Sequence, residues 1–197
     1  KGKNVIQTPI KSAVAFSSTQ WAAFLKLGEI DKVKGLLESN YTNNQVIHKL
    51  IREGKIKDLG QETCIDTEKL ISLKPDIILY SPYPTSNFDH LSELCGATVF
   101  PFADYLENHP LGRAEWLKVI GLLTGKENEA ESWFDDIEQK YNELKSRCEN
   151  VSNRPTVFSD LCIKFQKRYV IPFEFDINGR ASVFCNDMSF GFCVRFE

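Results

Sequence analysis

The sequence predicts an α/β protein whose first part is a Rossmann-like lobe built on a parallel sheet. Two observations carry this prediction. Between residues 11 and 102 short apolar runs alternate with amphipathic helical patterns, and after Pro110 only helical patterns follow as far as residue 151. The 197 residues are 42% hydrophobic and 26% charged, as in ordinary globular proteins. The net charge of −3 argues against nucleic acid as the main partner.

Four apolar runs are the predicted strands, because each is bounded by turn or capping residues, as buried parallel strands usually are. They are residues 12–16 (SAVAF), 33–37 (VKGLL), 76–80 (DIILY) and 97–100 (ATVF). A shorter run at 56–59 is a candidate for an extra edge strand. Helical patterns at 19–27, 43–53 and 86–95 provide the crossovers that parallel strands require.

A short helix is also predicted immediately before the strand at 76–80. Asp66 is its expected N-cap, Ile65 and Leu70 are spaced as a hydrophobic staple, and Pro75 ends it. Glu68 falls in the first turn of this helix, away from the apolar residues. We therefore expect the Glu68 side chain to be exposed.

The rest of the chain is organised differently. Residues 111–123 are apolar on more than one side, residues 127–151 form a long amphipathic helix, and residues 155–159 resemble the start of a further strand. The part after Asn153 holds eight of the 14 phenylalanines without a clear period. We expect an N-terminal ligand-binding lobe at 1–110, a helical connector at 111–152, and the start of an incomplete second lobe with an atypical tail at 153–197.

Sequence patterns of enzymes are weak in this chain. The nearest match to a phosphate-binding loop, residues 121–127 (GLLTGKE), lies between two helices, so we interpret it as a helix C-cap and turn. No GxGxxG follows the first strand, and no serine lies in a GxSxG elbow. The three histidines, His48, His90 and His109, have no metal-ligand spacing. We expect neither an enzyme nor a resident cofactor or metal ion.

Polar and aromatic residues follow each of the four predicted strands. In an open parallel sheet, ligands bind outside the carboxyl ends of the strands. Aromatic and hydroxyl side chains with few full charges suit a large planar or amphipathic ligand, bound by stacking and hydrogen bonds. The alternative is that the aromatic residues only cover the sheet edge, and composition weighs the two equally. The candidate ligand-binding residues are Ser17, Ser18, Thr19, Gln20, Trp21, Tyr41, Tyr80, Tyr83 and Tyr105.

Five sequence motifs occur in a familiar order: residues 10–19 (IKSAVAFSST), 27–35 (LGEIDKVKG), 57–60 (KDLG), 65–79 (IDTEKLISLKPDIIL) and 113–116 (RAEW), with a long helix after them. This order resembles the periplasmic substrate-binding proteins of ABC importers for ferric siderophores, haem and cobalamin, the class III type with a helical backbone. The resemblance covers residues 10–160. It implies two α/β lobes joined by a rigid helix, with an iron chelate (siderophore or haem) or a corrinoid held between them.

The resemblance also implies partners and a location. In this family one exposed glutamate on each lobe docks onto arginines of the membrane permease, and the N-lobe glutamate corresponds to Glu68. The alternative for Glu68 is a first-turn carboxylate that the helix dipole favours. The implied location is the periplasm or cell envelope of a bacterium, with a lipid anchor in the intact precursor by analogy.

The chain departs from the family pattern after residue 160. A glycine-rich strand and a complete second lobe cannot be read in residues 161–197, so we hypothesise a truncated form whose tail is an out-of-frame or otherwise aberrant continuation. Two other functions stay open on the sequence. One is an enzyme of flavodoxin-like or other doubly wound α/β type that uses the same strand-end loops, and the other is an interaction module that binds a protein through an exposed sheet edge.

Overall fold

The computed structural model describes residues 5–84 and 86–149 and, beyond them, the backbone of four short strands. The chain divides into two compact units, Lys1–Lys145 and Ser146–Glu197. In the second unit β8 (Ser159–Leu161) pairs antiparallel with β11 (Phe192–Val194), and β9 (Glu174–Phe175) with β10 (Ala181–Ser182). The rest of the predicted tail lies outside the described residues, and the predicted domain boundaries stay a prediction.

A five-stranded parallel sheet lies at the centre of the first unit, in the order β3-β2-β1-β6-β7. Its strands are β1 (Ala13–Ala15), β2 (Val33–Leu36), β3 (Lys57–Asp58), β6 (Ile77–Tyr80) and β7 (Thr98–Pro101). The predicted α/β class with a parallel sheet is therefore confirmed, and the expected edge strand forms as β3. The chain runs outward from β1 to β3 and then returns to the other side of β1, so the strand order reverses between β1 and β6.

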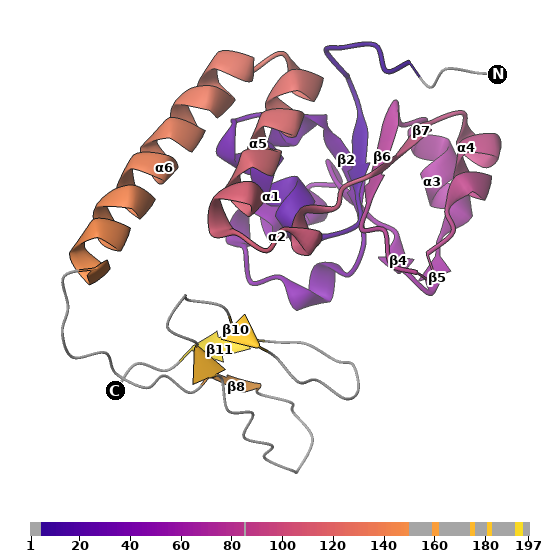
Figure 1. Cartoon of the computed structure of the whole chain (residues 1–197). Helices are drawn as coiled ribbons and strands as arrows, with labels where there is room; N and C mark the ends of the chain where they lie inside the picture. Colours follow the sequence, from indigo (N-terminus) through magenta and orange to yellow (C-terminus); the bar gives the residue numbers. More distant parts are fainter. Residues whose placement is uncertain are drawn as a thin grey trace. The chain divides into compact units, whose positions relative to one another are not determined.

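Each face of the sheet has its own hydrophobic core, because successive side chains along a strand point to opposite faces. Ala13 and Ala15 pack in one core, whose helical side chains come from α1 (Ser18–Lys26), α2 (Gln45–Arg52) and α5 (Pro110–Thr124). Val14 packs in the other core, with side chains of α3 (Thr67–Leu73) and α4 (Asp89–Cys95). Figure 1 shows the two helical layers on either side of the sheet. The first unit is thus a three-layer α/β/α sandwich.

The short helix α3 has the capping and packing that the sequence predicts. The Asp66 carboxylate accepts a hydrogen bond from the backbone N–H of Lys69 at 2.9 Å. Leu70 is fully buried, and Ile65 packs against the same core. Glu68 is exposed in the first turn. The N-cap and the exposure of Glu68 are both confirmed.

Two elements between the predicted ones differ from expectation. Helix α4 begins at Asp89 and not at residue 86, because Ser86 is used in the preceding loop: its hydroxyl accepts from the N–H of Tyr83 at 3.3 Å and donates to the carbonyl of Ser81 at 3.4 Å. A small antiparallel hairpin, β4 (Gly60–Gln61) and β5 (Cys64–Ile65), follows β3. Strands of two residues carry no detectable period, so the sequence pattern does not reveal them.

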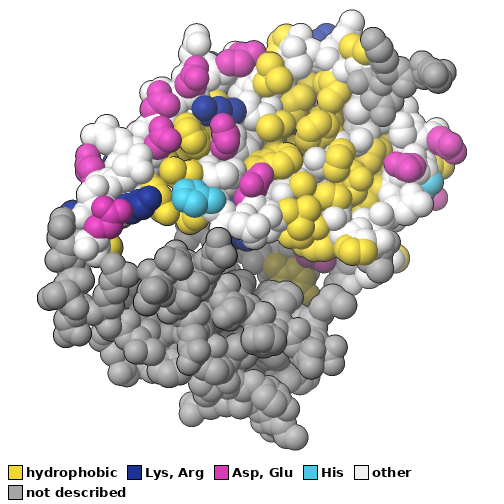
Figure 2. All heavy atoms as spheres, in the orientation of Figure 1, with side chains coloured by type: hydrophobic (Ala, Val, Ile, Leu, Met, Phe, Trp, Pro, Cys, Tyr) yellow, Lys and Arg dark blue, Asp and Glu magenta, His cyan; other side chains and the backbone are white. Residues whose placement is uncertain are grey.

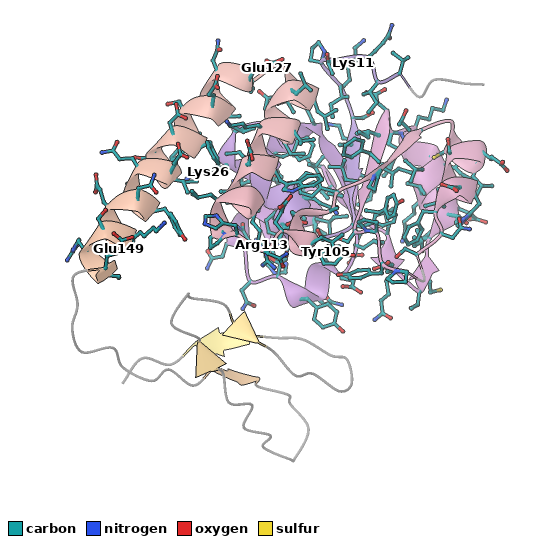
Figure 3. All side chains as sticks on the ribbon, viewed as in Figure 1. Lys11, Lys26, Tyr105, Arg113, Glu127 and Glu149 are labelled. Carbon is teal, nitrogen blue, oxygen red and sulfur yellow. The ribbon has the colours of Figure 1, made fainter. Side chains whose placement is uncertain are left out.

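Helix α5 and the long helix α6 (Glu127–Glu149) meet at a close turn. Gly125 takes a left-handed conformation (φ 77°) at the end of α5, which confirms the interpretation of residues 121–127 as a C-cap and turn. A Cβ atom on Gly121 would lie 2.6 Å from the Cβ of Ala130, so only glycine permits this approach. The Lys26 ammonium lies 3.4 Å from the centre of the Trp133 ring, and Figure 3 shows Lys26 reaching toward α6.

The face of α6 that carries the apolar stripe is only partly covered in the described structure. Ala130 is fully buried, whereas Trp133 is 39% and Leu144 is 56% exposed. Figure 2 shows acidic side chains along this helix, whereas hydrophobic side chains gather to the right of α5, where Figure 1 draws β6 and β7. Among the described residues no helix is both long enough and apolar enough to cross a bilayer.

Candidate functional site

A hollow of about 200 Å³ lies at the carboxyl ends of β1, β2 and β6. Ser17 and Ser18 border it after β1, Glu38 and Tyr41 after β2, and Tyr83 after β6. Because the strand order reverses between β1 and β6, this is the topological switch point of the sheet, where ligands of open α/β folds bind. The hollow therefore lies at the edge of the sheet where the sequence predicts a ligand.

A second hollow of about 660 Å³ adjoins the first. The two share Glu38, Glu62 and Tyr83 in their walls, and the second extends to Phe88 and His90 of the α4 region. The shared residues make the two hollows parts of one open surface. A surface of this size accommodates a drug-sized or larger ligand.

Gln20 holds the first loop of the site in place. Its side chain is fully buried, and its amide oxygen accepts hydrogen bonds from the backbone N–H groups of Phe16 (2.8 Å) and Ser17 (3.1 Å). Its amide nitrogen lies 3.4 Å from the hydroxyl of Ser81, on the loop after β6. Gln20 thus connects the two loops that flank the switch point. Its position in the sequence Ser-Ser-Thr-Gln, three residues after the N-cap, is that of a capping box.

The second loop carries an unusual backbone conformation. Glu38 adopts φ 58° and ψ 40°, in the left-handed region that glycine favours. Its N–H donates to the carbonyl of Gly60 at 2.8 Å, and the neighbouring Ser39 hydroxyl donates to the Asp58 carboxylate. These bonds attach the loop to the end of β3. They leave the ring of Tyr41 78% exposed at the border of the first hollow.

The third loop presents Tyr83, whose ring is 47% exposed and lies 4.8 Å from the ring of Tyr105, centre to centre. The Tyr105 hydroxyl donates to the carbonyl of Pro82 at 2.6 Å. Tyr105 is therefore a support for the loop after β6. Tyr80 lies farther back, with its ring 5.3 Å from that of Phe88 in an edge-to-face arrangement.

The motif at residues 113–116 fixes the turn that carries Tyr105. Arg113 donates from Nη2 to the carbonyl of Tyr105 and from Nε to the carbonyl of Glu107, each at 3.2 Å. Figure 3 shows Arg113 and Tyr105 close together at the end of α5. The Trp116 indole donates to Glu107 Oε1 at 3.1 Å, and its ring packs against Phe102. The motif thus holds the turn that carries Tyr105, which in turn contacts the loop after β6.

Two carboxylates give the site its electrostatic character. Glu38 and Glu62 line both hollows, and burial together with the charge of Glu38 raises the pKa of Glu62, although the nearby Ser86 hydroxyl opposes this. Burial also raises the pKa of the Tyr83 hydroxyl, and the nearby acidic groups raise it further. Among the described residues, neither hollow is lined by a lysine or an arginine.

The structure brings only part of the predicted set to the surface of the site. Ser17, Ser18, Trp21, Tyr41 and Tyr83 line the first hollow, although Trp21 is only 6% exposed and also belongs to the core. Thr19 is exposed, and its hydroxyl lies 3.0 Å from that of Ser17. Gln20, Tyr80 and Tyr105 border neither hollow and support the loops instead. Their role toward a ligand stays a prediction.

Sequence reasoning missed Glu62. It lies in the turn of the β4–β5 hairpin, which does not directly follow any of the four strands predicted from the sequence. Gly60, followed by a polar stretch before the helix at Thr67, is the available signal for a turn there. Within the described part of the chain no cluster of three or more His, Cys, Asp or Glu side chains is arranged to hold a metal ion.

A model of the family described as periplasmic binding protein matches residues 14–161. The chain belongs to this family. The family is one of binding proteins and not of enzymes, as the sequence predicts.

Relatives in sequence and in structure support the same assignment. An uncharacterised lipoprotein of Methanocaldococcus jannaschii is 32% identical over 155 residues, which cover 74% of this chain and 37% of that protein. The fold is similar to the petrobactin-binding protein YclQ of Bacillus subtilis (TM-score 0.62, 20% identity, 78% of this chain and 52% of that chain). It is also similar to the periplasmic haem-binding protein HutB of Vibrio cholerae (TM-score 0.62, 16% identity, 81% and 58%).

The chain spans only part of the length of these similar proteins. It matches 37% of the length of the archaeal lipoprotein and about half of the length of the two solved structures. At 16–20% identity the structural likeness concerns the fold. The ligand, the permease and the location are therefore matters of proposal.

Proposed function

We propose that this chain carries the N-terminal lobe and connector helix of a solute-binding protein of an ABC importer. In this proposal it captures an iron chelate (siderophore or haem) or a corrinoid and presents it to the membrane permease. The observation that carries the proposal is the hollow at the switch point of the sheet, in a member of the periplasmic binding protein family. Ser17, Ser18, Tyr41 and Tyr83 are the proposed ligand contacts.

The chemistry of the hollow supports a large ligand with extended flat surfaces. Tyr41 and Tyr83 are substantially exposed at its border, and Ser17 and Ser18 line the same hollow. Aromatic faces and hydroxyls bind planar and amphipathic molecules by stacking and hydrogen bonding. The similar solved structures include a petrobactin-binding and a haem-binding protein.

We also propose a location outside the cytoplasm, with attachment by a lipid anchor in the intact precursor. The support is the family itself and the description of two sequence relatives as lipoproteins. Both relatives belong to the archaeon Methanocaldococcus jannaschii, so the expectation of a bacterial source stays a prediction.

Glu68 is the proposed docking residue for the permease. It is exposed on α3, and neither hollow contains it in its walls, so docking and ligand capture use separate surfaces. Changing Glu68 to Arg would reverse the charge that meets permease arginines. We expect ligand affinity to stay within about twofold and binding to permease-containing vesicles to be lost, whereas Glu138→Arg on α6 should leave both intact. Retained vesicle binding by the Glu68 variant would contradict the docking role.

A binding titration tests the proposed function. The chain is titrated with haem, cyanocobalamin, a ferric trihydroxamate and a ferric triscatecholate, and tryptophan fluorescence reports binding. Saturable binding of one of them supports the proposal, provided that Tyr41→Ala and Tyr83→Ala each weaken it. Trp21 is left unchanged because its buried ring belongs to the core, and its loss would destabilise the fold. The absence of binding by a correctly folded chain would contradict the proposal.

A further inference from the structure

The charged side chains that line the two hollows are acidic. Two carboxylates, Glu38 and Glu62, lie in the walls of both hollows, and among the described residues no lysine or arginine lines either hollow. His90, the one histidine among the residues that line the hollows, is exposed on α4 and borders only the second hollow. This arrangement differs from the rest of the described surface, where acidic and basic side chains form repeated ion pairs.

The two carboxylates have no cationic partner in the described part of the chain. Its ion pairs engage other acids, such as Asp66 with Lys69 and Glu129 with Lys126. The groups that act on Glu62 are Glu38, which repels its charge, and the Ser86 hydroxyl. The charged and acidic groups that act on Tyr83 are Tyr105, Glu62, Asp104 and Glu38. The site therefore has a negative potential that no basic side chain of its own walls offsets.

The backbone gives an independent reason to assign Glu38 a role. A residue with a Cβ atom in the left-handed conformation costs about 1–2 kcal/mol relative to its ordinary conformation, and glycine relieves this cost. Glutamate nevertheless occupies this position, with its backbone held by the carbonyl of Gly60. Such conformations cluster at active sites and ligand clamps, and the other described non-glycine residue with a positive φ, Lys74, has an ordinary structural reason at the C-cap of α3. At Glu38 the side chain concerned lines the ligand surface.

We infer that Glu38 and Glu62 select the charge of the ligand: this face of the site favours a chelate or corrinoid that is neutral or positively charged, such as an amine-bearing ferric hydroxamate. It disfavours anionic ligands such as ferric triscatecholates and haem with its two propionates. The physical reason is that an anion would add repulsion to a pair that already lacks counter-charges, whereas an ammonium group would neutralise it. This inference rests on the proposed function and narrows it to one charge class.

The experiment compares three forms of one linear ferric trihydroxamate. The first has a free terminal amine and one positive charge, the second is N-acetylated and uncharged, and the third is N-succinylated with one negative charge. Iron coordination is the same in all three, so affinity differences report the charge of the tail. We expect the amine form to bind the full chain about tenfold or more tightly than the succinylated form at low ionic strength. In a Glu38→Gln/Glu62→Gln double variant the ratio should fall below about twofold.

Glu138→Gln is the matched control, since Glu138 is an exposed glutamate on α6 outside both hollows. It should leave the ratio unchanged. Three results would overturn the charge inference and leave the proposed function intact. The three forms could bind with equal affinity, the succinylated form, haem or a triscatecholate could bind more tightly than the amine form, or the affinity ratio could persist in the double variant. If cobalamin binds in place of the hydroxamates, the same comparison is made between cyanocobalamin and its monocarboxylic acid. Failure of every probe with a folded chain would overturn both.

Discussion

The replacement of Gln20 by methionine tests how the site is held together. Methionine has almost the same length as glutamine, so the change removes hydrogen bonds without leaving a large cavity. The lost bonds are those from the N–H groups of Phe16 and Ser17 to the amide oxygen, and the contact of the amide nitrogen with Ser81. The variant thus separates hydrogen bonding from packing at the switch point.

The expected loss of stability follows from what each partner retains. The Phe16 N–H also donates to the carbonyl of Leu79 at 3.1 Å, so it keeps an acceptor and loses about 0.5–1 kcal/mol. The Ser17 N–H is half-buried at the turn, and its unsatisfied state costs about 1–3 kcal/mol. Burial of the apolar methionine side chain offsets about 1 kcal/mol of this. We expect the free energy of unfolding to fall by about 2 kcal/mol.

The assay is urea unfolding followed by far-UV circular dichroism, with thermal unfolding as a second reading. A loss of about 2 kcal/mol corresponds to a Tm about 4–8 °C lower for a unit of this size. Ala22→Met is the control, because it introduces the same side chain at an exposed position of the same helix and should change stability by less than about 0.5 kcal/mol. If Gln20→Met is as stable as this control, the bonds of Gln20 do not hold the loops and the reasoning is refuted.

Substitutions at three further positions have definite expected outcomes. Gly121→Val forces a side chain against Ala130 at the α5–α6 turn and should cost about 2–3 kcal/mol in urea unfolding; a neutral result would mean that the turn adapts. Glu62→Gln should raise the Tm at pH 7 and not at pH 4. Burial and the charge of Glu38 raise the pKa of Glu62 above 4.5 in the folded protein, so the charged carboxylate destabilises the fold as the pH rises through the folded pKa. An equal effect on the Tm at both pH values would contradict this. In urea unfolding, Glu38→Gly should change the free energy of unfolding by less than about 1 kcal/mol in either direction, since glycine accepts the left-handed conformation. Glu38→Val should lower the free energy of unfolding by about 1–2 kcal/mol. If the glycine and valine variants are equally stable, residue 38 carries no backbone strain.

The sheet and most of its helices were predictable because local signals agree with the tertiary fold. Each central strand is a short apolar run buried on both faces, and α3 has an N-cap at Asp66, a staple at Leu70 and a stop at Pro75 within a few residues of each other. Where a local signal was missing, prediction failed. The β4–β5 hairpin is too short to show a period, and the start of α4 depends on hydrogen bonds that Ser86 makes within the loop.

The first hollow lies at the sheet edge that the sequence predicts for a ligand, but only some of the predicted residues line it. The rule that ligands bind at strand ends pointed to the edge where both hollows lie, since it depends only on the direction of the strands. Which side chains reach the surface depends on contacts between distant residues. Hydrogen bonds to the turn keep the Gln20 side chain buried and away from the surface of the hollows. The Tyr105 hydroxyl is engaged by the carbonyl of Pro82, which lies near Tyr105 because β6 and β7 are neighbours in the sheet. Glu62 arrives from a hairpin that the sequence pattern did not reveal.

The most direct test of the central claim is to map the binding surface on the unaltered chain by the backbone amide signals of its nuclear magnetic resonance spectrum. The probes are the amine-bearing ferric hydroxamate, with gallium in place of iron to avoid paramagnetic broadening, and cyanocobalamin. We expect saturable shifts concentrated at Ser17, Glu38 and Tyr83, which follow the ends of three different strands. Shifts confined to α6 or to the outer face of α5, or none at saturating probe, would contradict it.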